Sequence, residues 1–280
     1  MREVAIIGAG ALGGALAHVL AQRDIVRTVR LVDDTGRVAA GKALDIAQAA
    51  PVEGFATQLT GSADVATAAG ASVIVVADRA EGGDWQREEA LLLVQQLARM
   101  APDAIILCAG AAHRELIDIG VRERHLERGR LVGSAPEALA SGARALVALA
   151  VNGSPRDVAL TVVGVPPTQT VVAWNAAAVA GVALTRLVDE PTRRRLGARV
   201  VALWPPGPYA LAAAATAAID AMSGRSRRIV SCFVGPDLSV GARTRTAAMP
   251  VRLGASGLAE VVMPALSVAE QIALDNAMML

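Results

Sequence analysis

The most informative segment of the chain is Val4-Ala5-Ile6-Ile7-Gly8-Ala9-Gly10-Ala11-Leu12-Gly13, where an apolar β-rich run is followed by a glycine turn and then a helical pattern. Gly8 suits a tight turn, Gly10 allows a ligand to approach the backbone, and Gly13 allows the helix to pack close to the sheet. Free N–H groups at the start of such a helix attract phosphate, so the turn predicts a dinucleotide site. The residues expected to contact the dinucleotide are Gly8, Gly10, Ala11, Leu12 and Gly13.

A second signal comes from the acid at the end of the next apolar strand. Leu31-Val32 is followed by Asp33, which lies 25 residues after Gly8. This is close to the spacing of about 20 residues expected for an acid that binds the ribose hydroxyls. A carboxylate there repels a 2′-phosphate, so NAD is favoured over NADP. The alternative is a structural turn with a solvated Asp33.

The N-terminal half alternates short strands with longer helices, which predicts an α/β fold with a Rossmann-type, doubly wound parallel sheet over residues 1–134. The helical stretch 39–49 is expected to be closed by Pro51. The expected strands are Val4–Ile7, Val29–Val32, a weaker Gln58–Thr60, Val73–Ala77, Ala104–Cys108 and Arg130–Gly133; the expected helices are Leu12–Gln22, Ala39–Ala49, Trp85–Met100 and Arg114–Arg122.

The pattern changes after Ser134, and residues 135–280 are predicted to form an α+β C-terminal domain packed closely on the first. Two strands are expected to flank Gly235-Pro236. The expected helices are Glu137–Val151, Pro191–Leu203, Tyr209–Met222 and Val268–Met279, with further strands at Met249–Leu253 and Leu258–Val262.

Composition excludes several classes of protein. The net charge of +1 argues against a generic nucleic-acid binder or a polybasic membrane binder. With 54% hydrophobic and 2% aromatic residues, the chain folds on an Ala, Val, Leu and Ile core. Two cysteines, Cys108 and Cys232, are too few for a disulfide scaffold or a Cys-rich metal site and suggest the reducing cytoplasm. No targeting segment is evident, and the uncharged stretch 158–185 is expected to form strands rather than a membrane helix.

Several phrases resemble the L-lactate/L-malate dehydrogenase family, and the resemblance covers the whole chain. The phrases are Gly41-Lys42-Ala43-Leu44-Asp45-Ile46, Thr60-Gly61-Ser62-Ala63-Asp64, Val162-Val163-Gly164 and Tyr209-Ala210-Leu211-Ala212-Ala213-Ala214. The resemblance implies an oxidoreductase that moves a hydride between NAD and a 2-hydroxy acid. It also implies that the helix beginning near Gly41 lines a subunit interface of a homodimer or homotetramer.

The resemblance implies a catalytic set that this sequence lacks. The family uses a His as proton acceptor, an Asp that orients it and an Arg that binds the substrate carboxylate. Pro166 occupies the His place in Gly164-Val165-Pro166-Pro167-Thr168. Gap-free counting puts Leu139 at the Asp place and Gly142 at the Arg place. Arg144 would serve only if a gap were allowed inside the helix.

Two residues remain as candidates for catalysis. Arg87 matches the family's carbonyl-polarising Arg if one residue of the loop is deleted; alternatively, it is a solvated residue at a helix start. His113 follows a strand at the carboxyl edge of the sheet, where ligands bind. The weaker candidates are Asp84 and Glu137, whereas His18 and His125 are expected on helix or surface positions.

Three functions stay open. A scaffold that binds NAD but has lost this chemistry is preferred, because once one member of a cooperating set is gone the others contribute little. An active malate- or lactate-type dehydrogenase is the alternative, although losing the base forfeits roughly 10²–10⁴-fold in rate. The third is a different oxidoreduction that uses His113 or an acid.

Overall fold

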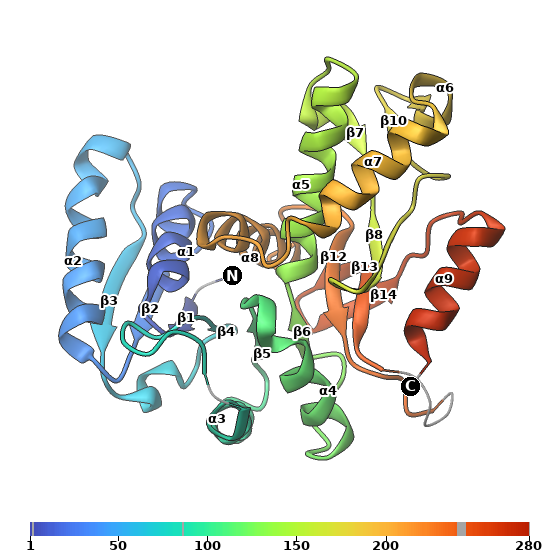
Figure 1. The fold of residues 1–280 in the computed structure, drawn as a ribbon. Helices are drawn as coiled ribbons and strands as arrows, with labels where there is room; N and C mark the ends of the chain where they lie inside the picture. Colours follow the sequence, from blue (N-terminus) through green and yellow to red (C-terminus); the bar gives the residue numbers. More distant parts are fainter. Residues whose placement is uncertain (2, 86, 240–244, 280) are drawn as a thin grey trace.

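A computed structural model describes residues 1, 3–85, 87–239 and 245–279. Its N-terminal half alternates strands and helices as expected (Figure 1). The strands are β1 (Glu3–Ile7), β2 (Thr28–Val32), β3 (Gln58–Ser62), β4 (Val73–Val76), β5 (Ile105–Cys108) and β6 (Leu131–Gly133). The helices are α1 (Ala11–Gln22), α2 (Gly36–Glu53), α3 (Arg87–Met100) and α4 (Arg114–Arg122), with short 3-10 turns η1 (Val65–Ala68) and η2 (Ala111–His113).

The first six strands form a parallel sheet in the order β3-β2-β1-β4-β5-β6. This is the order of a Rossmann-type fold, in which the strand order reverses between β1 and β4. All residues of β4 and β5 are buried, as expected for strands covered on both faces. Ligands of such sheets bind at the carboxyl ends of the strands flanking the reversal, so residues just after β1 and β4 are in position to form a site.

The C-terminal half extends the same sheet and adds a small antiparallel one, in which the strands follow the order β11-β10-β7. β12 pairs antiparallel with β6, and β13, β8 and β9 follow in order. α8 packs between α1 and α5 (Figure 1). The strands of this half are β7 (Val158–Ala159), β8 (Val162–Val165), β9 (Gln169–Val172), β10 (Ala178–Val179), β11 (Val182–Ala183), β12 (Val230–Val234), β13 (Ala247–Gly254) and β14 (Gly257–Val261). Its helices are α5 (Ala135–Ala150), α6 (Leu184–Leu187), α7 (Glu190–Val201), α8 (Pro208–Met222) and α9 (Val268–Met278), with the 3-10 turn η3 (Pro155–Asp157).

Two expectations about element ends need correction. Pro51 lies inside α2 and does not close it. The helix ends at Gly54, whose φ of 78° is the left-handed cap that glycine favours and whose N–H donates to the Ala50 carbonyl at 2.8 Å. A proline one turn from the end removes one N–H donor, and the helix continues past it. Of the two strands expected around Gly235-Pro236, β12 precedes it; residues 237–239 form none, and 240–244 lie outside the described residues.

The uncharged stretch 158–185 forms β7 to β11 and the start of α6, as its proline-interrupted pattern predicts. Among the residues that the structure describes, no helix is both long and apolar enough to span a membrane.

Candidate functional site

The glycine turn has the backbone geometry that its sequence predicts. Gly8 has a φ of 109°, and a Cβ there would overlap the Asp78 carbonyl. A Cβ on Gly13 would overlap the Gly8 carbonyl, so α1 packs directly against the end of β1. Glycine is required at both positions for steric reasons.

The space in front of Gly10 is filled by the chain itself. A Cβ on Gly10 would overlap the Asp78 carboxyl group. The Asp78 Oδ2 accepts a hydrogen bond from the Leu12 N–H at 3.2 Å, and Oδ1 accepts from the Gly13 N–H at 3.0 Å. A carboxylate therefore binds the first turn of α1, where a helix favours an anion.

Asp78 contacts the glycine turn although its sequence context did not single it out. It follows the buried strand β4 by two residues, at the carboxyl edge of the sheet and beside the reversal of strand order. An acid after that strand was the available signal. The backbone N–H groups of the turn fit a pyrophosphate, but the Asp78 carboxylate does not, so NAD phosphates do not fit this conformation.

Asp33 lies where the sequence places it, directly after β2 and beside the glycine turn. It is buried, with an exposed fraction of 3%. Its Oδ2 accepts hydrogen bonds from the N–H groups of Ala9 and Ala80, both at 2.8 Å, and its Oδ1 accepts from the Thr35 N–H at 2.9 Å. Three backbone N–H groups thus donate to the carboxylate that is expected to bind the ribose.

The loop after β4 folds back onto the end of the sheet. The Arg79 N–H donates to the Gly83 carbonyl at 2.9 Å, and the Trp85 indole N–H donates to the Ala77 carbonyl at 2.9 Å. The Arg79 guanidinium stacks 5.0 Å from the centre of the Trp85 ring and lies 3.4 Å from a Glu89 carboxylate oxygen. This loop, which resembles the family's mobile loop, closes on its own residues here.

Arg87, the expected carbonyl-polarising residue, is the first residue of α3 and is ion-paired with Glu115 of α4. Its side chain is 64% exposed. The hydrogen bond and charge of Glu115 raise the pKa of Arg87. The cavity beside the glycine turn, of about 280 Å³, is lined instead by Leu12, Asp78, Asp84 and Leu211 among others.

His113 is buried at the end of η2, with 3% of its surface exposed. Its Nδ1 accepts a hydrogen bond from the Gly110 N–H at 3.1 Å, while its Nε2 has no hydrogen-bond partner among the described residues. Burial lowers the pKa of His113, and the negative charges of Asp84 and Asp78 oppose that shift. The imidazole is therefore neutral near pH 7, and because Nδ1 accepts from Gly110, its proton lies on Nε2.

The positions where the family resemblance places catalytic groups hold residues without that chemistry. Pro166 is buried directly after β8. Leu139 is buried in the apolar cluster of α5. A Cβ on Gly142 would lie 2.6 Å from Leu203 Cδ1, so the side chain of Leu203 occupies the direction in which an Arg at that position would extend.

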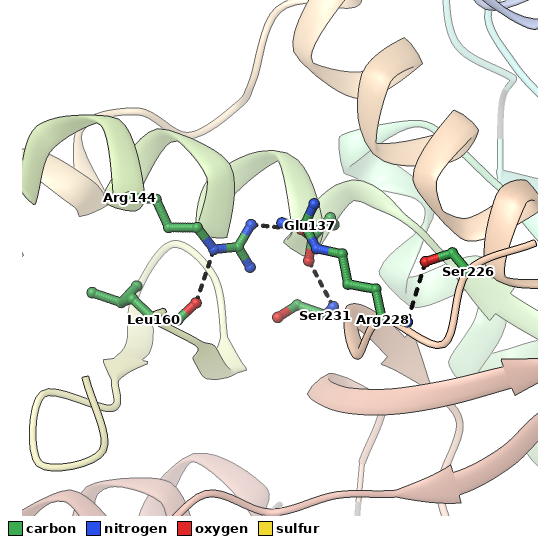
Figure 2. Close-up of polar contacts among 6 residues, drawn as sticks. All are labelled: Glu137, Arg144, Leu160, Ser226, Arg228 and Ser231. Carbon is green, nitrogen blue, oxygen red and sulfur yellow. Dashed lines mark hydrogen bonds and ion pairs between the residues drawn. The ribbon is translucent and has the colours of Figure 1, made fainter. Parts of the chain in front are cut away.

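Arg144 and Glu137, weighed as substitutes for lost groups, form an ion pair in which Glu137 is buried and Arg144 is partly buried. Figure 2 shows Arg144 and Arg228 converging on Glu137. The Arg144 Nη1 donates to Glu137 Oε1 at 2.7 Å and its Nε donates to the Leu160 carbonyl at 3.1 Å. The Ser231 N–H donates to Glu137 Oε2 at 2.8 Å. These contacts link α5, β12 and the segment before β8.

The other two histidines, His18 and His125, make contacts elsewhere in the chain or lie at the surface. His18 lies in α1 and its Nε2 is 3.1 Å from a Glu53 carboxylate oxygen of α2. His125 is exposed, with a φ of 53° in the loop after α4. Among the described residues, no cluster of three His, Cys, Asp or Glu side chains could hold a metal ion.

Comparison with known proteins assigns the N-terminal domain. Residues 2–111 match the model of the lactate/malate dehydrogenase, NAD binding domain. The malate dehydrogenase of Thermomicrobium roseum is 31% identical over 98% of this chain and 94% of that protein. The malate dehydrogenase of Desulforudis audaxviator is 30% identical, again over 98% of this chain and 94% of that protein.

Solved structures share the fold over nearly the whole chain. The malate dehydrogenase of Salinibacter ruber has a TM-score of 0.85 at 24% identity, covering 99% of this chain and 94% of that chain. The lactate dehydrogenase of Cryptosporidium parvum, complexed with lactic acid and nicotinamide adenine dinucleotide, has a TM-score of 0.88 at 21% identity with the same coverage.

Proposed function

The chain belongs to the lactate/malate dehydrogenase family, and on that premise we propose that it is a catalytically impaired or altered member. Its N-terminal domain is the family's NAD-binding domain. The observation that carries the proposal is the joint replacement of three cooperating groups by Pro166, Leu139 and Gly142. Residues of a catalytic set act as a unit, so the loss of all three removes the usual route for the proton and the substrate carboxylate.

The surroundings of these positions support the proposal, because they have adapted to apolar packing. Leu139 is fully buried, and Leu203 lies against Gly142. Arg144 donates from Nε to the Leu160 carbonyl and from Nη1 to Glu137, so these two groups make structural contacts within the chain. Such a chain would act as a nucleotide-responsive binding subunit or as a structural partner of an active dehydrogenase.

An altered reaction is the second candidate, and the imidazole of His113 favours it. This side chain is neutral near pH 7, buried, and has an unpartnered Nε2 among the described residues. Because Nδ1 accepts from the Gly110 N–H, Nε2 carries the ring proton, so His113 would donate a proton to a substrate without a carboxylate and would accept one only after the Gly110 contact opened. Arg87 would contribute only if its ion pair with Glu115 opened.

The activity test is the absorbance of NADH at 340 nm with oxaloacetate or pyruvate. We expect no loss above background, because no base or carboxylate clamp of the family type is present. The malate dehydrogenase of Thermomicrobium roseum, assayed in parallel with oxaloacetate, is the positive control. Clear turnover by this chain would overturn the proposal. If that turnover disappeared in His113→Gln and persisted in His125→Gln, His113 would be the acid–base group of an active malate- or lactate-type dehydrogenase.

We also propose that the chain forms a homo-oligomer, a dimer or tetramer. Leu44 and Val52 of α2 are 61% and 90% exposed, and they lie eight residues apart on one side of the helix. Exposed apolar side chains on one helix face are typical of an interface between subunits.

A further inference from the structure

We propose that Asp78 sets the affinity of the NAD-binding domain for phosphate, because its carboxylate competes with the pyrophosphate of NAD for the N–H groups of the glycine turn. The inference rests on the assignment of that domain and is independent of whether the chain catalyses a reaction. It concerns the affinity for phosphate, which binding measurements report without turnover.

The first argument is position. Asp78 follows β4, and the glycine turn follows β1; these two strands flank the reversal of strand order at which open α/β sheets bind their ligands. The donors that a dinucleotide phosphate would use are the free N–H groups at the start of α1. Two of them, those of Leu12 and Gly13, donate to the two carboxylate oxygens of Asp78.

The second argument is steric. Gly10 is the turn residue whose missing side chain allows a phosphate to approach the backbone. The Asp78 carboxyl group lies in that space, since a Cβ on Gly10 would overlap its Cγ and Oδ2. A phosphate and this carboxylate cannot both occupy the position.

The third argument is charge. A carboxylate and a pyrophosphate are both anions, so Asp78 repels the ligand even when its side chain rotates away from the N–H groups. Without that carboxylate the turn attracts anions, because it combines the start of α1 with the Lys42 ammonium, which donates to the Gly10 carbonyl at 2.7 Å. Asp78 therefore reverses the charge preference of the turn.

The same short segment also engages the second anchor of the dinucleotide. Two residues after Asp78, the Ala80 N–H donates to Asp33 Oδ2, the acid expected to bind the ribose. NAD binding thus requires the segment 78–80 to give up contacts at both the phosphate and the ribose positions. The ligand must compete with contacts that are already made.

Isothermal calorimetry with NAD⁺ tests the inference on three variants of the full chain. We expect Asp78→Gly, which removes both the charge and the bulk, to lower the Kd for NAD⁺ at least about tenfold. Asp78→Asn keeps the shape and removes the charge, so it should lower the Kd by a smaller factor. Asp103→Asn is the control; it removes an equal charge at an exposed position after α3, outside this cavity and the glycine turn, and should change the Kd less than about threefold.

Adenosine, which has no phosphate, distinguishes the turn from the rest of the site. Its Kd should change less than about threefold between wild type and Asp78→Asn. Equal Kd values for NAD⁺ in wild type and both Asp78 variants would overturn the inference, as would an equal gain in Asp103→Asn. Circular dichroism confirms folding of each variant, and Asp78→Asn provides the answer if Asp78→Gly does not fold. None of these outcomes depends on the 340 nm assay, so failure of one proposal leaves the other testable.

Discussion

His113 illustrates at the residue scale how burial sets the protonation of a single group. Desolvation disfavours the charged imidazolium, and the nearby carboxylates of Asp84 and Asp78 do not compensate for it. The folded pKa of His113 is therefore lower than the value of about 6.5 expected in the unfolded chain. Between those two values, the unfolded chain binds a proton at this position and the folded chain does not.

This difference predicts a loss of stability on acidification. As the pH falls below about 6.5, the free energy of unfolding should decrease by up to about 1.4 kcal/mol per pH unit from His113 alone, down to its folded pKa. Urea unfolding at pH 7.5, 6.5 and 5.5 measures the slope. His113→Gln should flatten it, whereas His125→Gln, at an exposed position, should leave it unchanged. A slope that is the same in wild type and His113→Gln would refute this assignment.

The thiols of the two cysteines are also unreactive because they are buried. Burial raises the pKa of Cys108 to about 12, and burial together with the charge of Glu137 raises the pKa of Cys232. Neither forms a thiolate near neutral pH, so nucleophilic or redox roles are disfavoured.

At the scale of elements, glycines decide how closely α2 approaches the sheet. A Cβ on Gly61 of β3 would overlap the backbone of Ala39 and Ala40 in α2. Gly41, in the same helix, has no atom within 4 Å of its virtual Cβ and lies on the exposed face. One glycine is thus required by packing, and the other only increases the flexibility of the unfolded chain.

These two positions predict opposite effects of alanine. Gly61→Ala should lower the free energy of unfolding by about 2 kcal/mol, because α2 and β3 must move apart. Gly41→Ala should raise it by about 0.5–1 kcal/mol, because alanine is the better helix former. Urea denaturation measures both changes. Equal effects of the two substitutions would mean that the contact between α2 and β3 is less tight than the structure indicates.

On the scale of the whole molecule, the shared sheet joins the two halves. Phe233 of β12 is fully buried, is paired in register with Gly133 of β6, and packs edge-on against Trp204 with ring centres 6.0 Å apart. The core around it contains residues of both halves. The boundary near Ser134 therefore marks a change from parallel to antiparallel pairing within one sheet.

The exposed apolar face of α2 predicts the state of assembly. Light scattering should give a mass of at least twice the 28.6 kDa of the chain. The double variant Leu44→Glu/Val52→Glu places charges on this face and should shift the mass towards the monomer, because unpaired charges are costly to bury. Leu92→Glu, at a 64% exposed position of α3, is the control and should leave the mass unchanged. A monomeric wild-type chain would contradict the proposal.

Much of the fold could be predicted because the signals are local. α4 begins and ends at the predicted residues, and β1 and α1 each begin one residue before their predicted start. The agreement is close because hydrophobic periodicity and a glycine turn act within a few residues. The end of α2 was misjudged because Pro51 is tolerated near a helix end. The pairing of β12 with β6 was not predictable, because it joins segments about a hundred residues apart.

The order of residues was enough to predict that a parallel sheet opens with a glycine turn. It also showed that proline, leucine and glycine stand where the family resemblance places catalytic groups, because residue identity decides whether a group can accept a proton. What fills the glycine turn became evident from the packing of the folded chain. Asp78 is separated from Leu12 by 66 positions, and it reaches the start of α1 because β4 pairs with β1. A contact of that kind depends on strand order and packing, which no local pattern encodes.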